Sequence, residues 1–137
     1  MDEISQLQNY LAAGGKLLLT SSVYAQTPQL DAVLAQFGLA RAEGMVVEGD
    51  SSKALYNSAW SLLPDYGTPT ESTALNGVNT NTHVMLSVAQ GITVTETEDV
   101  TAEPLLNSSS AAYAKTDIND LTTMEREDGN ADGPFAL

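Results

Sequence analysis

Over residues 3–48, apolar residues at helical spacing alternate with short continuous apolar runs, and this alternation limits the folds that the chain can adopt. Apolar residues recur at helical spacing over 3–13, and the glycines 14–15 that follow predict the end of this helix. The apolar run over 16–20 then predicts a short strand that is covered on both faces. Because the glycines precede a strand and do not open a helix, they do not fit a phosphate-binding loop.

The same order of patterns returns over the next segment. Thr27 and Pro28 are residue types that favour the start of a helix, and an apolar stripe at helical spacing continues to Phe37. The run 45–47 predicts a second strand. Alternating helices and strands are typical of an α/β domain, so we expect a three-layer α/β fold with a mostly parallel sheet flanked by helices and right-handed crossovers.

The remainder of the chain has weaker patterns. Partial helical spacing over 51–63 predicts a third helix. Residues 64–82 are rich in Thr, Asn, Pro and Gly, which predicts a loop with one helical turn near 71–75. Short apolar or alternating runs predict strands over 83–86, 91–95 and 104–106.

The two ends of the chain differ from those of a complete domain of this class. The chain starts with a helix and no preceding strand, and it ends in the apolar run 134–137 after an acidic stretch over 117–133. We therefore expect residues 1–137 to be a single α/β domain that forms the C-terminal part of a larger domain. Missing strands would leave a sheet edge exposed, which favours a homodimer.

The composition excludes several classes of function. Five Lys and Arg residues against 18 Asp and Glu residues give a net charge of −13, which argues against binding nucleic acid or an anionic membrane surface. The absence of Cys excludes thiolate catalysis and Cys-ligated zinc, and the single His83 excludes a site with two His ligands from one chain. No run reaches the ~18 apolar residues that a membrane helix needs, so we expect no membrane insertion by this segment.

One motif is a candidate metal site. Asp128, Asn130 and Asp132, followed by Gly133, match the first half of a calcium-binding loop, in which alternating oxygen ligands surround a hard cation. No amphipathic helix flanks the motif. The alternative interpretation is a solvated turn, for which Asp, Asn and Gly are equally suited.

The remaining polar residues do not predict a catalytic site. Glu96, Glu98 and Asp99 lie beside the predicted strand, with Glu103 close behind, and Glu96 and Glu98 would project on the same face. No apolar surroundings would shift the pKa of either carboxyl group toward acid–base work. A solvated acidic edge fits them better. His83 at the start of a predicted strand fits a structural or exposed residue, so we expect no catalytic residue and no enzymatic activity.

Two aromatic residues allow a binding interpretation. Tyr56 and Trp60 lie four residues apart and could line a sugar-binding surface, with the loop 64–82 as a lid. Packing along one face of the predicted helix is the alternative explanation.

Five segments in order resemble the GldG-like family, which are auxiliary components of ABC transporters named for gliding motility. Residues 7–19 are similar to a family segment with the pattern YL-x-x-GGKLLL, and 30–39 end in the same FGL. Residues 44–48 resemble its G-x-VV strand, 103–109 its PLL-x-(T/S)-S segment, and 133–137 its glycine-proline turn before a final strand.

The resemblance implies an extracytoplasmic domain of a membrane-anchored parent protein, with a glutamine-amidotransferase-like or flavodoxin-like fold. Its partners would be the permease and ATPase subunits of an ABC system, and it implies no cofactor. The amidotransferase nucleophile is a Cys, which this chain lacks. The expected function is therefore that of a non-catalytic auxiliary domain. The alternative is a carbohydrate- or calcium-binding module of a degenerate amidotransferase-like fold.

Overall fold

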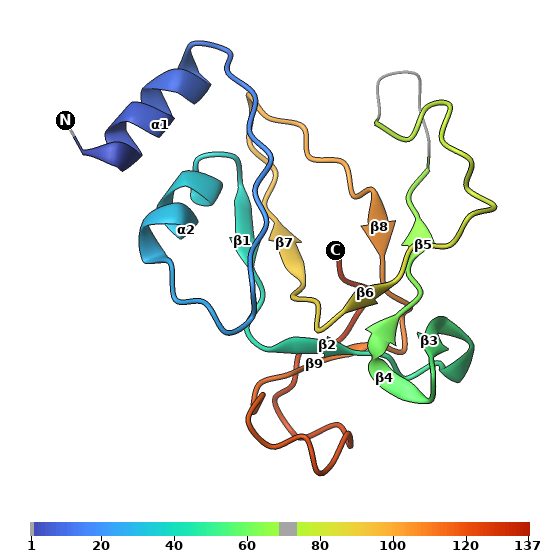
Figure 1. Ribbon diagram of the computed structural model, residues 1–137. Helices are drawn as coiled ribbons and strands as arrows, with labels where there is room; N and C mark the ends of the chain where they lie inside the picture. The colour runs from blue at the N-terminus through green and yellow to red at the C-terminus, as the bar shows by residue number, and fades with distance from the viewer. Residues whose placement is uncertain (1, 69–73) are drawn as a thin grey trace.

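The computed structural model describes residues 2–68 and 74–137, and Figure 1 shows their arrangement. The described residues form two helices, α1 (Glu3–Ala12) and α2 (Pro28–Ala35), and one 3-10 turn, η1 (Ser51–Lys53). Their strands are short: β1 (Leu39–Arg41), β2 (Met45–Val47), β3 (Ala54–Leu55), β4 (Ser58–Leu62), β5 (Asp65–Tyr66), β6 (Leu86–Ser87), β7 (Ile92–Val94), β8 (Leu106–Asn107) and β9 (Tyr113–Lys115). None of the helices in the described ranges is long and apolar enough to cross a bilayer.

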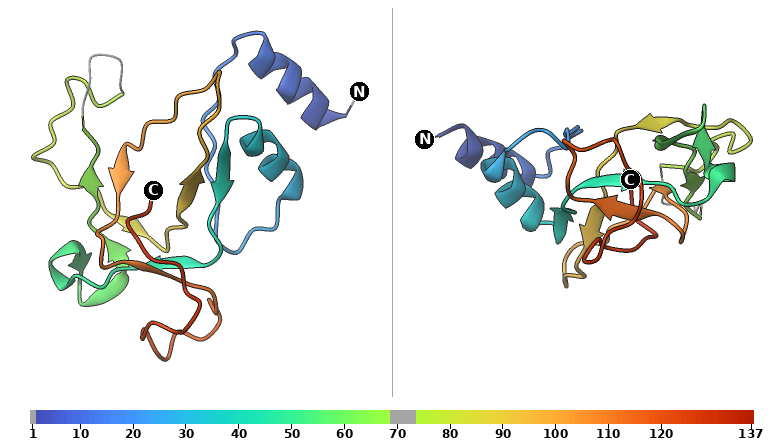
Figure 2. Two further views of the ribbon diagram at one scale, coloured as in Figure 1. Left: turned by 180° about the vertical axis from the view of Figure 1, so that it is seen from behind. Right: turned by 90° about the horizontal axis from the view of Figure 1, so that it is seen from below.

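The expectation of a three-layer, mostly parallel α/β fold is wrong, and so is the glutamine-amidotransferase-like or flavodoxin-like fold that the resemblance implied. The strands pair as β1–β7, β2–β9, β3–β4–β6 and β5–β8, and every one of these pairings is antiparallel. The two helices lie together at one end of the molecule, opposite the β3–β4 hairpin, so they do not cover two faces of one sheet (Figure 2). The prediction placed 16–20 and 45–47 as strands of one parallel sheet, whereas 16–20 pairs with no strand and β2 pairs antiparallel with β9.

The last residues of the chain connect two of the strand pairs. Ala136 forms bridges with both Ile92 of β7 and Asn107 of β8. The Ile92 N–H donates to the Ala136 carbonyl at 2.8 Å, and the Leu137 N–H donates to the Leu106 carbonyl at 3.0 Å. The apolar run 134–137 therefore lies between β7 and β8 and links β1–β7 to β5–β8.

The core lies on both sides of the β2–β9 pair. Val46 and Ala114 are paired in register and face a cluster that also holds Ala42, Leu62, Ala112 and Phe135. Met45, Val47 and Tyr113 face the opposite cluster, against which Trp60 and Met124 pack. Because side chains alternate along a strand, burial on both faces makes β2 apolar at every position, as the sequence shows.

The remaining predictions of elements have mixed outcomes. The two helices and the strands at 45–47 and 91–95 are confirmed, while the strands predicted at 83–86 and 104–106 begin later, at β6 and β8. The helix predicted over 51–63 is wrong, because that segment forms η1 and the β3–β4 hairpin. Tyr56 and Asn57 both have φ of 56°, which allows the tight turn that joins these two strands. The helical turn predicted near 71–75 lies mostly outside the described residues.

Candidate functional site

An exposed apolar surface surrounds β1 and β7. We define it by five residues, of which Leu18 is 90% exposed and Leu17, Ile92, Val94 and Leu105 are 37–44% exposed. Soluble domains seldom leave a contiguous apolar patch of this kind without an interaction role. This surface is therefore the first candidate for function.

The sheet register places the strand residues of the apolar surface on one face. Leu39 pairs with Val94, and Arg41 pairs with Ile92. Paired residues of an antiparallel ladder point to the same side, and residues two apart on a strand share a face. All four side chains thus lie on the same face of β1–β7, with three apolar groups and one arginine.

A groove of about 460 Å³ lies where this face meets the helices. Segment 17–19 forms one wall, α2 contributes Val33 and Leu34, and Leu39 and Ile92 line the sheet side. The helix places these side chains in the groove because its apolar stripe repeats every three to four residues. Most of the lining is apolar, so water in the groove is held only weakly.

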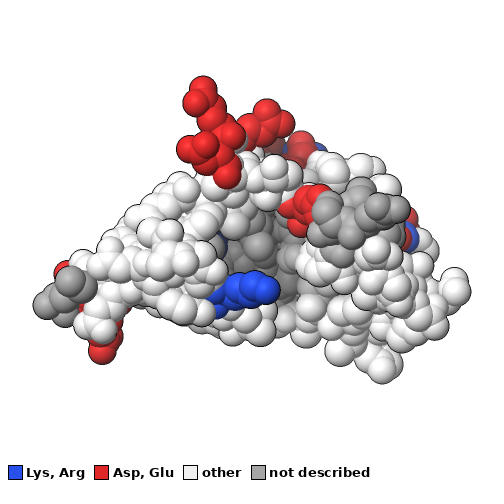
Figure 3. Space-filling model, turned by 90° about the horizontal axis from the view of Figure 1, so that it is seen from above, with Lys and Arg blue, Asp and Glu red and all other residues white. Residues whose placement is uncertain are grey.

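A second hollow continues the apolar surface past β7. It has a volume of about 220 Å³ and is lined by Val94, Leu105 and Leu137, together with Leu39 and Ile92 of the first groove. Because the two hollows share Leu39 and Ile92, they are adjacent parts of one surface. Seen from above, the molecule is hollowed between its two sides (Figure 3).

Segment 17–20 is extended and has no strand partner (Figure 1). Within the described residues, the backbone groups of 17–20 form no hydrogen bond. Lys16 just before it is held by Tyr10, whose hydroxyl accepts from the Lys16 N–H and donates to the Lys16 carbonyl, each at 3.2 Å. The segment therefore presents free backbone donors and acceptors beside apolar side chains, as an unpaired sheet edge does.

The charges around the apolar surface are mostly negative. Glu103 lines the second hollow, and Glu96, Glu98 and Asp99 are exposed on the connection between β7 and β8. In Figure 3 a basic side chain lies on one rim of the hollow and acidic side chains lie on the other. The exposure of these carboxylates agrees with the solvated acidic edge expected for Glu96 and Glu98.

A polar cleft of about 590 Å³ lies beside the groove, with Arg41 between them. The guanidinium donates from Nε to Asp31 Oδ1 at 2.7 Å, from a second nitrogen to Oδ2 at 2.9 Å, and to the Ala25 carbonyl at 3.1 Å. The bonds from Arg41 lower the pKa of the Asp31 carboxyl and raise the pKa of the guanidinium. These bonds connect α2 to β1 through Arg41, so we assign its guanidinium a structural role.

Gln90 also lines the polar cleft. Its Nε2 donates to the Ala42 carbonyl at 2.8 Å, while its buried Oε1 has no hydrogen-bond partner in the described structure.

Two buried charged residues have structural partners. Glu48 accepts from the backbone N–H groups of Asp50 at 3.0 Å and Ser109 at 3.2 Å, and from the Ser109 hydroxyl. The Lys115 ammonium donates to Glu127 at 3.2 Å. Carboxylates that accept several bonds from neighbouring loops hold those loops in place, so we assign both groups to the fold.

The predicted calcium ligands are partly engaged by protein groups. Asn130 is buried, and its Oδ1 accepts from the Glu127 N–H at 3.1 Å. Asp132 forms an ion pair with Arg126 at 2.7 Å, and Asp128 is exposed. No group of three or more His, Asp or Glu side chains placed to hold a metal ion occurs among the residues that the structure covers. The calcium site stays a prediction.

The other predicted site residues do not come together. Tyr56 lies at the tip of the β3–β4 turn and is 85% exposed, whereas Trp60 lies on β4 and packs against the Met45 cluster. They are therefore not on one helical face, because the helix on which that interpretation depended is absent. His83 is exposed and lies in the chain before β6.

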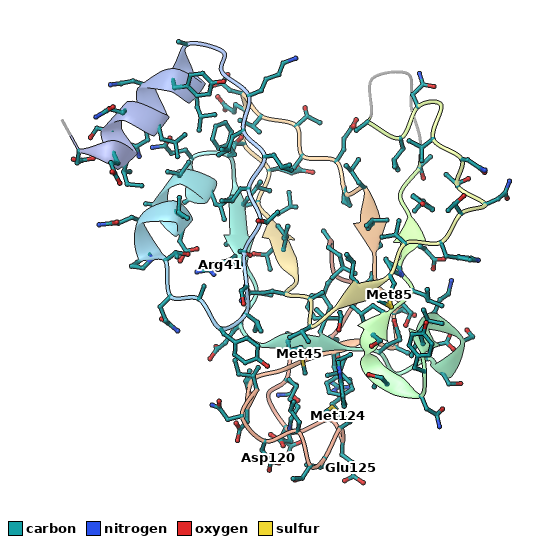
Figure 4. All side chains as sticks on the ribbon, in the orientation of Figure 1. Arg41, Met45, Met85, Asp120, Met124 and Glu125 are labelled. Atoms are coloured by element: carbon teal, nitrogen blue, oxygen red, sulfur yellow. The ribbon has the colours of Figure 1, made fainter. Side chains whose placement is uncertain are left out.

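The acidic segment after β9 forms a loop below the sheets. Met124 packs against the cluster of Met45, while Asp120 and Glu125 project from the far side of the loop (Figure 4). The Tyr113 hydroxyl donates to the Met124 carbonyl, and burial raises the pKa of this phenol. The loop is thus anchored to β9 by Tyr113 and Lys115.

The apolar surface was not predicted from the sequence. The apolar run 16–20 predicts a strand covered on both faces, whereas most of this segment is exposed in the structure. A signal was present, because the leucines at 17–19 include no β-branched residue of the kind that buried strands favour. Comparisons with family models, curated proteins and solved structures found no match to this chain.

Proposed function

We propose that the chain is a non-catalytic protein-interaction domain, and that it serves as the extracytoplasmic auxiliary domain of an ABC-type transport system. The observation that carries the interaction role is the apolar surface of Leu17, Leu18, Ile92, Val94 and Leu105. Removing these side chains from water would favour association by roughly 25 cal/mol for each Å² of apolar area buried.

The transport context is supported by the five ordered segments that resemble the GldG-like family. The first of these segments ends in the leucines 17–19 that form the edge of the apolar surface. The partners that we propose are therefore the permease and ATPase subunits of the same system, and the permease is the expected direct contact. The parent protein would be anchored at the extracytoplasmic face of the membrane.

Site-specific photo-crosslinking of the full-length protein in its native host tests this proposal. A photo-crosslinking side chain is placed at position 18 and, as a matched control, at position 56. Both positions are highly exposed, at 90% and 85%, but Tyr56 lies on the β3–β4 turn and lines neither the groove nor the second hollow. We expect position 18 to yield a crosslink to a transporter subunit that position 56 does not. Equal background from both positions, or capture of proteins unrelated to transport, would contradict the proposal.

A further inference from the structure

The occupant of the apolar surface can be specified more closely. Resting on the proposed function, we infer that the partner contributes an extended segment of alternating apolar residues flanked by Lys or Arg. This segment pairs as a β-strand with residues 17–20 and places its side chains over the two apolar hollows.

The free backbone groups of 17–20 select a strand over a helix. A helix satisfies its backbone donors and acceptors internally, so it would cover this edge without pairing with it. An added strand instead forms a ladder of N–H to C=O bonds, which is the basis of recognition by strand addition. Four residues at about 3.3 Å each span roughly 13 Å, which is enough to pair with about four residues of the partner.

The shape of the surface suits alternating side chains. The groove of about 460 Å³ and the hollow of about 220 Å³ are separate depressions that meet at Leu39 and Ile92. Successive residues of a strand point to opposite sides, so those facing the molecule are two positions apart and can occupy successive depressions. The groove has both helical and strand walls, and its apolar lining favours aliphatic side chains.

Charge excludes a second copy of this chain as the favoured occupant. Each copy carries a net charge of −13, and Glu103 lines the hollow itself. Two such surfaces would bring like charges together, whereas a segment flanked by Lys or Arg would place opposite charges beside Glu103 and the exposed Glu96 and Glu98. The inference therefore differs from the homodimer that the sequence led us to expect.

Matched synthetic peptides test the inference against the intact chain. The probe is an acetylated, amidated, fluorescently labelled peptide with the sequence Lys-Val-Thr-Val-Thr-Val-Thr-Lys. Two further peptides carry N-methyl groups on all valines or on all threonines, which removes the N–H groups from one edge or the other without changing the side chains. A fourth peptide has Glu in place of both Lys residues. Binding is measured by fluorescence anisotropy and located by amide chemical shifts.

We expect saturable binding of the first peptide, with the largest shifts in residues 17–20 and in β7. One of the two methylated peptides should bind at least about tenfold more weakly, because two or more backbone hydrogen bonds are lost. The peptide with Glu ends should also bind more weakly, and the difference between it and the probe should shrink as salt is raised, because salt screens exposed charges.

Two results would overturn the inference. One is that none of the peptides binds, and the other is that both methylated peptides bind as tightly as the unmethylated probe. Amide chemical-shift changes confined to residues outside 17–20 and β7 would also overturn the inference. If position 18 still crosslinks to a transporter subunit in any of these cases, the proposed function stands and only the strand-pairing inference fails.

Discussion

Lys115 is fully buried on β9, and its ammonium group lies 3.2 Å from a carboxylate oxygen of Glu127. A buried cation is expensive to hold without a partner, so this ion pair, together with the Tyr113 hydroxyl, attaches the acidic loop after β9 to the core. The buried Glu48 plays a similar part between the turn after β2 and the loop at Ser109. At the scale of residues, the fold depends on a few charged groups that sequence patterns do not identify.

Removing the carboxylate of the Lys115–Glu127 pair should destabilise the fold more than removing the buried ammonium group of Lys115. We expect Glu127→Gln to lower the free energy of unfolding by about 1–3 kcal/mol, less than for a fully buried pair because Glu127 is half-exposed. Lys115→Met keeps the side-chain length and removes the desolvated charge, so its cost should stay below about 1.5 kcal/mol. Urea unfolding of the two variants measures both values. A larger loss for Lys115→Met than for Glu127→Gln would contradict this explanation.

The Asp31–Arg41 pair should make stability depend on acidic pH. Its hydrogen bonds lower the pKa of Asp31 below the ordinary value of 3.8, so the contribution of the pair is present above that pH. It is lost as the pH falls through the folded-state pKa, because the protonated carboxyl no longer attracts Arg41. We expect Asp31→Asn to melt at a lower temperature than the natural chain at pH 7 and at nearly the same temperature well below pH 4. A difference that stays constant over this range would show that the charge of Asp31 does not contribute.

At the scale of elements, sequence patterns correctly predicted the helices and strands that depend on neighbouring residues alone. The helix α2 begins at Pro28 after Thr27, as these residue types indicate, although the Thr27 side chain forms no capping bond. The strand β2 is buried on both faces, as its apolar run indicates. The patterns failed where distant partners decide the structure. The pairing of β2 with β9 joins residues 66 to 70 positions apart, and no local periodicity encodes which strands meet. Segment 51–63 has helical spacing, yet its packing against β2 and β6 makes it a hairpin.

The β3–β4 turn contains a residue that suits it poorly. Tyr56 has φ of 56°, which is unfavourable for a bulky side chain but common for Asn. Because the ring is exposed, Tyr56→Asn removes little packing, and we expect it to raise the free energy of unfolding by about 0.5–1 kcal/mol. Tyr24→Asn is the matched control, since Tyr24 is also exposed and lacks a positive φ. A gain for the control equal to that of Tyr56→Asn would rule out the turn as the cause.

The loop at 128–133 allows a direct test of the calcium prediction. The ion pair of Asp132 with Arg126 and the buried contact of Asn130 favour a turn stabilised by protein groups. We therefore expect the melting temperature to be the same in about 1 mM calcium and in chelator, because only a ligand that binds the folded state raises it. A rise with calcium that disappears in Asp128→Asn would instead establish the calcium site.

At the scale of the whole molecule, the acidic surface and the apolar surface have different consequences. A net charge of −13 keeps copies of the chain apart and opposes self-association, while the exposed apolar residues around 17–20 favour contact with another protein. The sequence predicted the charge and the absence of thiol chemistry from composition alone. It did not predict the apolar surface, because exposure of Leu17 and Leu18 follows from strand pairings made elsewhere in the chain.

Amide hydrogen exchange in the free protein tests most directly whether the edge at 17–20 is unpaired. We expect the amides of 17–20 to exchange at nearly the rate of an unstructured peptide, and those of Val46 and Ala114 in the β2–β9 pair to be strongly protected. The rates should be the same at low and high protein concentration. Protection of 17–20 comparable to that of Val46 would show that this segment already has a strand partner, and it would contradict the docking surface proposed for it.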